Sequence, residues 1–166
     1  MIKRLTGPYI FSDEYKEKMR FIAGPRQTGK TTLAVRFLKE RKLAKLYYNW
    51  DKREVRDRYH KNPYFYSDDI LSLPTHNKKW VCFDEIHKMP KWKNILKDFH
   101  DTEKGKIRFI ITGSARLDLL RKSGDSLAGR YFLFHLFPVS LRELVSPVRH
   151  NGRLMQKPEK DGVSFV

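Results

Sequence analysis

One stretch decides the fold of this chain, and it reads Ala23-Gly24-Pro25-Arg26-Gln27-Thr28-Gly29-Lys30-Thr31-Thr32. It fits the pattern G-x-x-x-x-G-K-[ST] at every position. The apolar run before it predicts a buried strand over residues 19–23, and apolar residues at helical spacing after it predict a helix over residues 29–41. The motif therefore stands between a strand and a helix, which is the context it requires.

The residue types of this loop suit the binding of a phosphate. Glycine permits close approach and unusual φ values, so that successive backbone N–H groups can surround an anion. The helix that begins near Gly29 points the positive end of its dipole at the same anion. We expect Lys30 to reach the β- and γ-phosphates and the Thr31 hydroxyl to ligate Mg²⁺. A chance match is the alternative, and the flanking strand and helix argue against it. The expected nucleotide-binding residues are Gly24, Pro25, Arg26, Gln27, Thr28, Gly29, Lys30, Thr31 and Thr32.

Length and composition indicate one globular domain. The 166 residues include eleven Phe, eight Tyr and three Trp to fill a core, and a chain of this size buries roughly two-thirds of its unfolded surface. No apolar run reaches membrane-spanning length, and no signal-peptide core follows the first four residues. The single cysteine, Cys82, allows no internal disulfide framework. We therefore expect a cytoplasmic protein without a membrane partner.

The net charge of +16 raises the question of a nucleic-acid partner. The basic residues are spread along the chain and do not gather in one arm. Two interpretations stay open, a solvated basic surface and a groove that binds nucleic acid.

Strands and helices alternate along the rest of the chain. Further strands are predicted over residues 44–50, 80–83, 108–112 and 131–137, and an amphipathic helix follows Pro90. This alternation predicts an α/β fold with a parallel sheet whose ligands bind at the carboxyl ends of the strands. The loop, Asp84-Glu85 and Thr112 all follow predicted strands, so we expect them along one edge of the sheet.

Smaller features fill the gaps between these elements. Residues 53–58 are expected to form an exposed helical turn or loop, residues 117–120 a helical segment and residues 123–125 a turn. Ser140 and Glu143 have the spacing of a capping box, which predicts a short helix with Leu144 and Val145 facing inward.

Asp84 and Glu85 supply the second half of the expected chemistry. Four apolar residues followed by an acid is how the second motif of a P-loop protein reads, so Asp84 is expected to hold Mg²⁺ opposite Thr31. Glu85 is expected to orient and deprotonate the attacking water. An ordinary exposed acidic pair is the alternative. The guanine-reading pattern Asn-Lys-x-Asp fails at the fourth place of Asn77-Lys78-Lys79-Trp80, and ATP is therefore the expected nucleotide.

Four other positions have weaker signals. Thr112 is expected to sense the γ-phosphate or the water, with Ser114 as second choice, although a polar residue at a strand end is often a turn former. Arg130 is expected to stabilise the charge of the transition state, and a surface arginine is its alternative. His87 is expected to be a loop or packing residue.

Six motifs together carry a resemblance to a known family. They are Gly24–Thr32, Tyr48-Asn49-Trp50-Asp51, Phe83-Asp84-Glu85-Ile86-His87-Lys88, Ile111-Thr112-Gly113-Ser114, Ser126-Leu127-Ala128-Gly129-Arg130 and Phe137–Glu143. Over about residues 5 to 145 the chain resembles the ATPase domain of prokaryotic AAA-type ATPases that carry a separate C-terminal domain of unknown function. The resemblance implies a five-stranded sheet in the order 5-1-4-3-2, helices on both faces and ATP hydrolysis.

The resemblance also implies roles for individual residues. It assigns phosphate contacts to Gly24–Thr32, Mg²⁺ to Thr31 and Asp84, the base to Glu85 and the sensor to Thr112, and it extends to Arg130. It divides the chain into an ATPase domain over residues 1–145 and a polar tail over residues 146–166 that begins a further C-terminal region.

The expected function is a Mg²⁺-dependent ATPase that drives a conformational change in a partner, with self-association as a further expectation. The alternatives are a nucleic-acid-binding module with an ATP switch and a remnant that does not hydrolyse ATP.

Overall fold

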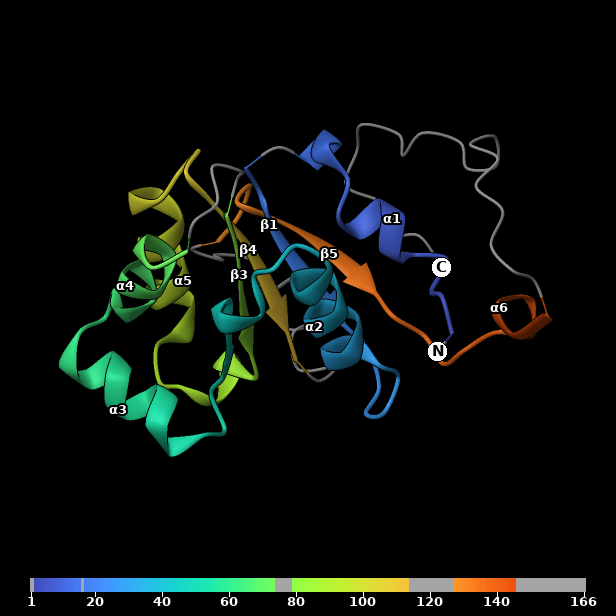
Figure 1. The fold of residues 1–166 in the computed structure, drawn as a ribbon, viewed down its shortest axis with the longest axis horizontal. Helices are drawn as coiled ribbons and strands as arrows, with labels where there is room; N and C mark the ends of the chain where they lie inside the picture. The colour runs from blue at the N-terminus through green and yellow to red at the C-terminus, as the bar shows by residue number, and fades with distance from the viewer. Residues whose placement is uncertain (1, 16, 74–78, 114–126, 146–166) are drawn as a thin grey trace.

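The computed structural model describes residues 2–15, 17–73, 79–113 and 127–145, which build one sheet and its covering helices (Figure 1). Ser114, the predicted helical segment 117–120, the predicted turn 123–125 and the tail 146–166 lie outside the described residues.

The elements follow one another in the alternating order that the sequence predicts. The strands are β1 (Met19–Ala23), β2 (Tyr47–Asn49), β3 (Lys79–Asp84), β4 (Ile107–Thr112) and β5 (Tyr131–His135). The helices are α1 (Gly7–Ile10), α2 (Lys30–Glu40), α3 (Arg53–Lys61), α4 (Phe65–Leu71), α5 (Trp92–Thr102) and α6 (Leu141–Val145). Single 3₁₀ turns lie at Asp13–Tyr15, Ala44–Leu46 and Ile86–Lys88. Across the described ranges, no helix has the length and apolar character needed to cross a membrane.

The strands lie in the order β2-β3-β4-β1-β5, and every pair that the structure describes is parallel. This is the predicted order 5-1-4-3-2 counted from the other edge, so the prediction is confirmed. Asp84 lies opposite Thr112 in the register of β3 and β4, and Ile22 lies opposite Thr112 in that of β1 and β4. The three strand ends that carry the candidate site therefore meet at one edge of the sheet.

Aromatic contacts show that helices cover both faces of the sheet, as predicted. Because side chains alternate along a strand, Trp80 and Phe83 of β3 point to opposite faces. Trp80 contacts Phe37 of α2 with ring centroids 4.9 Å apart. Phe83 contacts Phe99 of α5 at 5.5 Å, and Tyr66 of α4 contacts Phe99 at 5.0 Å. Helix α2 thus covers one face, and α4 and α5 cover the other (Figure 1).

Three elements have other lengths than the sequence predicts. Residues 44–46 form a 3₁₀ turn that buries Leu46, and β2 pairs only over Tyr47–Asn49. Strand β5 ends at His135 because the chain leaves the sheet just before Pro138, a residue with no N–H to donate. The predicted turn at residues 53–58 is part of a longer helix, α3.

The predicted orientation of α6 is wrong. Leu144 and Val145 were expected to face inward, and they are 58% and 79% exposed. The buried residue is Glu143, whose carboxylate accepts a hydrogen bond from Arg4 Nε at 3.1 Å. An ionic contact thus orients this short helix in place of an apolar one. The capping box is confirmed, since Ser140 N donates to Glu143 Oε2 at 3.0 Å and Glu143 N to Ser140 Oγ at 3.3 Å.

The segment before β1 is fastened to the sheet by a buried arginine. Arg20 of β1 is fully buried, and its guanidinium donates to the backbone oxygens of Ser12 at 3.0 Å and of Ile10 at 3.3 Å. Its charge also lies over the Trp80 ring, 5.3 Å from the centroid. These contacts hold residues 7–15 against the face that α2 covers.

Candidate functional site

The predicted phosphate-binding loop connects the carboxyl end of β1 to the first turn of α2. Gly24 and Gly29 have φ values of 145° and 90°, which residues with a side chain rarely adopt. A Cβ atom at Gly24 would lie 2.2 Å from the backbone oxygen of Leu136. Glycine is therefore required at position 24 by the passage of the chain after β5 as well as by the turn of the loop.

Lys30 points its side chain back into the loop. Its Nζ donates to Gly24 O at 2.8 Å and also to Pro25 O, and the Thr28 hydroxyl donates to the same Pro25 oxygen at 3.0 Å. Burial lowers the pKa of Lys30, while the charges of Glu85 and Asp84 act in the opposite direction. The loop thus holds one ammonium group at its centre and leaves residues 25–27 exposed at its tip.

Three hydroxyl groups converge on the buried carboxylate of Asp84. Its Oδ2 accepts hydrogen bonds from Thr31 Oγ1 at 2.9 Å and from Tyr47 OH at 2.6 Å. Its Oδ1 accepts one from Thr112 Oγ1. Thr31 and Asp84, predicted together as metal ligands, are therefore in direct contact, and Thr112 lies beside them. Burial and the bond to Asp84 raise the pKa of Tyr47 well above its usual value, so that its hydroxyl stays a donor.

Glu85 follows in a strained backbone conformation and faces a different environment. Its φ is 60°, in the left-handed region, and its N–H donates to Thr112 O at 3.0 Å. Its carboxylate lies 3.6 Å from both His87 Nε2 and Lys88 Nζ. Lys88 in turn contacts Asp51 Oδ1 at 2.5 Å. The predicted base is thus partly exposed and lies beside Lys88 and His87, whereas Asp84 is enclosed by hydroxyls.

The donor set fits Mg²⁺, which prefers hard oxygen ligands and keeps several water molecules. Thr31 and Asp84 offer a hydroxyl and a carboxylate at the same strand edge. Within the part of the chain that the structure describes, no three His, Cys, Asp or Glu side chains group together as a metal cage. Such a site suits an ion that completes its shell with phosphate and water oxygens.

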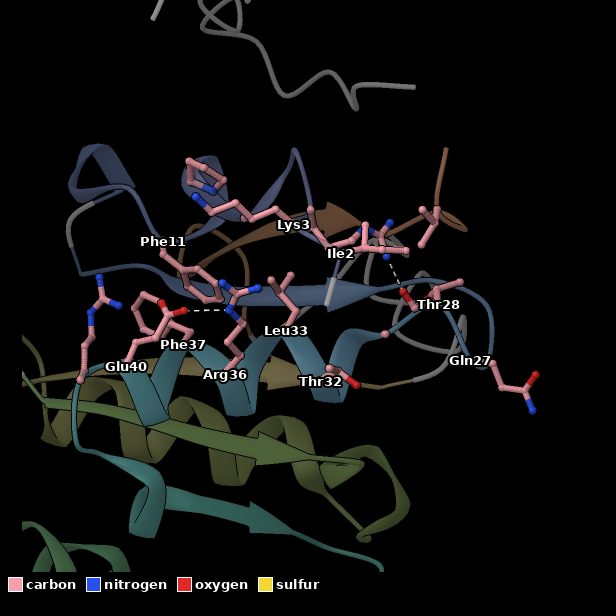
Figure 2. A pocket seen from close by; sticks show the side chains of 16 residues that line it. Ile2, Lys3, Phe11, Gln27, Thr28, Thr32, Leu33, Arg36, Phe37 and Glu40 are labelled. Atoms are coloured by element: carbon pink, nitrogen blue, oxygen red, sulfur yellow. Dashed lines mark hydrogen bonds and ion pairs between the residues drawn. The ribbon is translucent and has the colours of Figure 1, made fainter. Parts of the chain in front are cut away.

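A pocket of about 550 Å³ adjoins the loop and lies between α2 and the N-terminal segment (Figure 2). One wall is the N-terminal segment with Lys3, Pro8 and Phe11, and the other is α2 with Thr32, Leu33, Arg36 and Phe37. Gln27, Thr28 and Gly29 of the loop close one end. The lining of the pocket is mixed: about half of its residues are polar or charged, and the rest are apolar residues or glycines.

Arg130 lies far from the loop. Its backbone oxygen accepts a hydrogen bond from Met19 N at 2.9 Å, at the amino end of β1. Gly24 comes five positions after Met19, which is roughly 16 Å along an extended strand. The Arg130 guanidinium makes two hydrogen bonds to Asp101 of α5. Its Nε donates to Oδ1 at 2.8 Å and its Nη2 to Oδ2 at 3.0 Å. The structure therefore brings together all predicted site residues that it describes except Arg130.

Sequence reasoning missed two residues that contact the site. Tyr47 is one of two adjacent tyrosines, and only the register of β2 against β3 tells which of them faces Asp84. Arg4 precedes every motif, yet its Nη1 donates to Thr28 O in the loop at 2.6 Å.

The fold and the site define the class of protein. A parallel α/β sheet with a G-x-x-x-x-G-K-[ST] loop between its first strand and the following helix is the architecture of a P-loop nucleoside triphosphatase. The chain belongs to the AAA domain family, whose model matches residues 16–145. This range extends from just before β1 to the end of α6. No curated protein matches the sequence.

Proposed function

We propose that this chain binds ATP together with Mg²⁺ at Gly24–Thr32 and hydrolyses it. The observation that carries the proposal is the proximity of three different groups at one strand edge: the enclosed ammonium of Lys30, the Thr31 hydroxyl and the Asp84 carboxylate. Membership of the AAA domain family supports an ATPase-like, nucleotide-binding module.

Each of these residues has a role in the proposed reaction. Lys30 binds the β- and γ-phosphate oxygens, and Thr31 and Asp84 would hold the metal ion. Mg²⁺, when bound, supplies positive charge against the phosphates. Glu85 takes the proton of the attacking water, and its partial exposure leaves it accessible to that water. Thr112 donates to Asp84 and presents the backbone oxygen that fixes Glu85 N, and it is proposed to sense the phosphate from this position.

The pocket beside the loop supports binding of the rest of the nucleotide. It extends from Thr28 and Gly29 along α2, and Leu33, Phe37 and Phe11 give it apolar surface for a flat purine base. Lys3 in the lining provides positive charge for a nucleotide, and Arg36 beside it is paired with Glu40 at 2.7 Å. The base and ribose are therefore proposed to lie between the N-terminal segment and α2 (Figure 2).

Contacts of Arg4 support coupling of the nucleotide to a partner or a further region. The guanidinium donates to Thr28 O in the loop, to Phe137 O after β5 and to Glu143 of α6. One side chain thus connects the proposed phosphate site with the last described helix. A change in the loop on hydrolysis is proposed to reach α6 by this route.

Replacement of the loop lysine tests the proposal. Lys30→Ala removes a charged hydrogen-bond donor, worth about 1.5–3 kcal/mol, and we expect ATP affinity to fall about 10- to 100-fold or more. Titration of a fluorescent ATP analogue measures it, and Lys39→Ala, on the exposed face of the same helix, is the matched control. Unchanged affinity in a folded Lys30→Ala chain would refute nucleotide binding at this loop.

Phosphate release distinguishes the alternatives. Because the net charge is +16, phosphate release should be measured with and without DNA or RNA. Binding of nucleic acid that weakens with rising salt would support a nucleic-acid-binding module with an ATP switch. ATP binding without any phosphate release would support a non-hydrolysing remnant.

A further inference from the structure

Tyr47 is the hydroxyl at Asp84 that the motifs do not account for. Thr31 belongs to the phosphate-binding loop and Thr112 to the end of β4, and both were expected at the site. Tyr47 comes from β2, outside the predicted site motifs, and its hydroxyl donates to Asp84 Oδ2 at 2.6 Å. In the register of the sheet Tyr47 lies opposite Cys82, two residues before the Asn49–Asp84 pair, so the length of the phenol ring carries its hydroxyl forward to the carboxylate.

The neighbouring tyrosine provides a comparison within the same strand. Tyr48 points to the opposite face, contacts Phe65 of α4 and donates its hydroxyl to Asp69 Oδ2 at 2.7 Å. Tyr48 is buried and Tyr47 is partly buried, and each donates one hydrogen bond to an aspartate. Only Tyr47 donates to an aspartate of the candidate site.

A carboxylate can rotate, and its orientation decides which lone pairs face a ligand. The two oxygens of Asp84 are held from three elements, by Thr31 of α2, Tyr47 of β2 and Thr112 of β4. Of the two donors to Oδ2, Thr31 lies in the proposed nucleotide site, whereas Tyr47 belongs to the sheet and lies outside the loop. Tyr47 can therefore orient Asp84 independently of the state of the loop.

We propose that Tyr47 is a positioning residue that orients Asp84 for Mg²⁺ bound with ATP. This inference rests on the proposed function. Outer-shell groups that bond to metal-binding carboxylates typically affect metal affinity by 10- to 100-fold. Loss of the Tyr47 hydroxyl should therefore raise the Mg²⁺ concentration needed for nucleotide binding. The contacts that the nucleotide makes with the loop without metal should stay unchanged.

Tyr47→Phe with Tyr48→Phe as the matched control tests the proposal. Each substitution removes one part-buried hydroxyl that donates to an aspartate, on adjacent residues of one strand. A non-hydrolysable ATP analogue is held at fixed concentration, Mg²⁺ is titrated, and the shift in melting temperature reports binding. We expect the half-saturating Mg²⁺ concentration to rise about tenfold or more in Tyr47→Phe and to stay at the parent value in Tyr48→Phe. In EDTA the analogue should bind all three chains equally.

A second pair of variants tests the route through the carboxylate. In an Asp84→Asn background, Tyr47→Phe should not raise the Mg²⁺ requirement further. A parent-like requirement in Tyr47→Phe, an equal rise in Tyr48→Phe, or an additive effect with Asp84→Asn would overturn the proposal. So would a Tyr47→Phe chain that fails to fold while Tyr48→Phe folds, because the hydroxyl would then serve stability. If the parent chain shows no Mg²⁺-dependent binding, the proposed function itself fails.

Discussion

Asp84 and Glu85 are neighbours in the sequence, and their surroundings give them different chemistry. Asp84 is 3% exposed and accepts hydrogen bonds from three hydroxyl groups, which suits a ligand held in a fixed orientation. Glu85 leaves the strand with a φ of 60°, and its carboxylate lies near His87 and Lys88. Two adjacent acids thus have different surroundings, which is compatible with their proposed roles as ligand and base.

Glu85→Gln should retain ATP and Mg²⁺ binding and lose hydrolysis. An amide can still bond to the water but cannot accept its proton, and the loss of a general base typically lowers a rate 10²- to 10⁴-fold. Phosphate release and nucleotide titration measure the two properties separately, with Glu54→Gln on the exposed side of α3 as control. Turnover at the parent rate would show that Glu85 is not the base. Asp84→Asn should instead have a defect that eases at high Mg²⁺.

At the scale of elements, the sequence predicted best where a motif defines both ends of an element. Strand β1 was predicted over its whole length, and α2 to within one residue at each end, because the loop between them requires a strand before and a helix after. Strands β3 and β4 were also predicted to within one or two residues, since their apolar runs are buried on both faces.

Prediction failed where contacts distant in the sequence decide the structure. The inward face of α6 is set by Arg4, which lies 139 residues before Glu143, and no local pattern reveals this pair. Tyr47 was missed for the same reason, because its role depends on strand register. The loop residues were predicted as one set, but sequence alone could not show that Gly24 is also confined by Leu136.

The Glu143 carboxylate should make the free energy of unfolding depend on pH. Burial raises its pKa, but hydrogen bonds from Ser140 N, Leu5 N and the Arg4 guanidinium outweigh this effect, so its pKa in the folded chain is lower than the ordinary 4.5. A group with a lowered pKa stabilises the fold above its unfolded pKa and loses this contribution as the pH falls through the folded value.

Glu143→Gln should therefore be destabilising at pH 7, by about 1–3 kcal/mol for a buried hydrogen-bonded charge. The difference from the parent should shrink as the pH falls from 5 toward 3, because the parent then loses its charge as well. Urea unfolding at several pH values measures it, with the exposed Glu54→Gln as control. An equal difference at pH 7 and at pH 3 would contradict the role of the ionised carboxylate.

At the scale of the whole molecule, the length of the strands separates Arg130 from the other residues proposed to act in hydrolysis. The loop, Asp84 and Glu85 lie at the carboxyl edge, whereas Arg130 lies at the amino edge, fixed by Asp101. A reach of roughly 16 Å along β1 exceeds the length of an arginine side chain. An arginine at this place can complete a phosphate site only in a second chain, as self-association would allow.

Arg130→Ala should leave ATP affinity nearly intact and lower turnover, because an arginine that stabilises the transition-state charge accelerates such reactions about a thousandfold or more. Turnover per chain of the parent should rise with protein concentration. A mixture of Arg130→Ala and Glu85→Gln chains should recover some activity, since each supplies what the other lacks. Asp101→Asn is the matched control: it breaks the same ion pair but keeps the arginine, so its turnover should exceed that of Arg130→Ala. Equal turnover in these two variants would show that Arg130 matters only through its ion pair with Asp101. An inactive mixture of chains shown to co-assemble would refute the action of Arg130 in a neighbouring site.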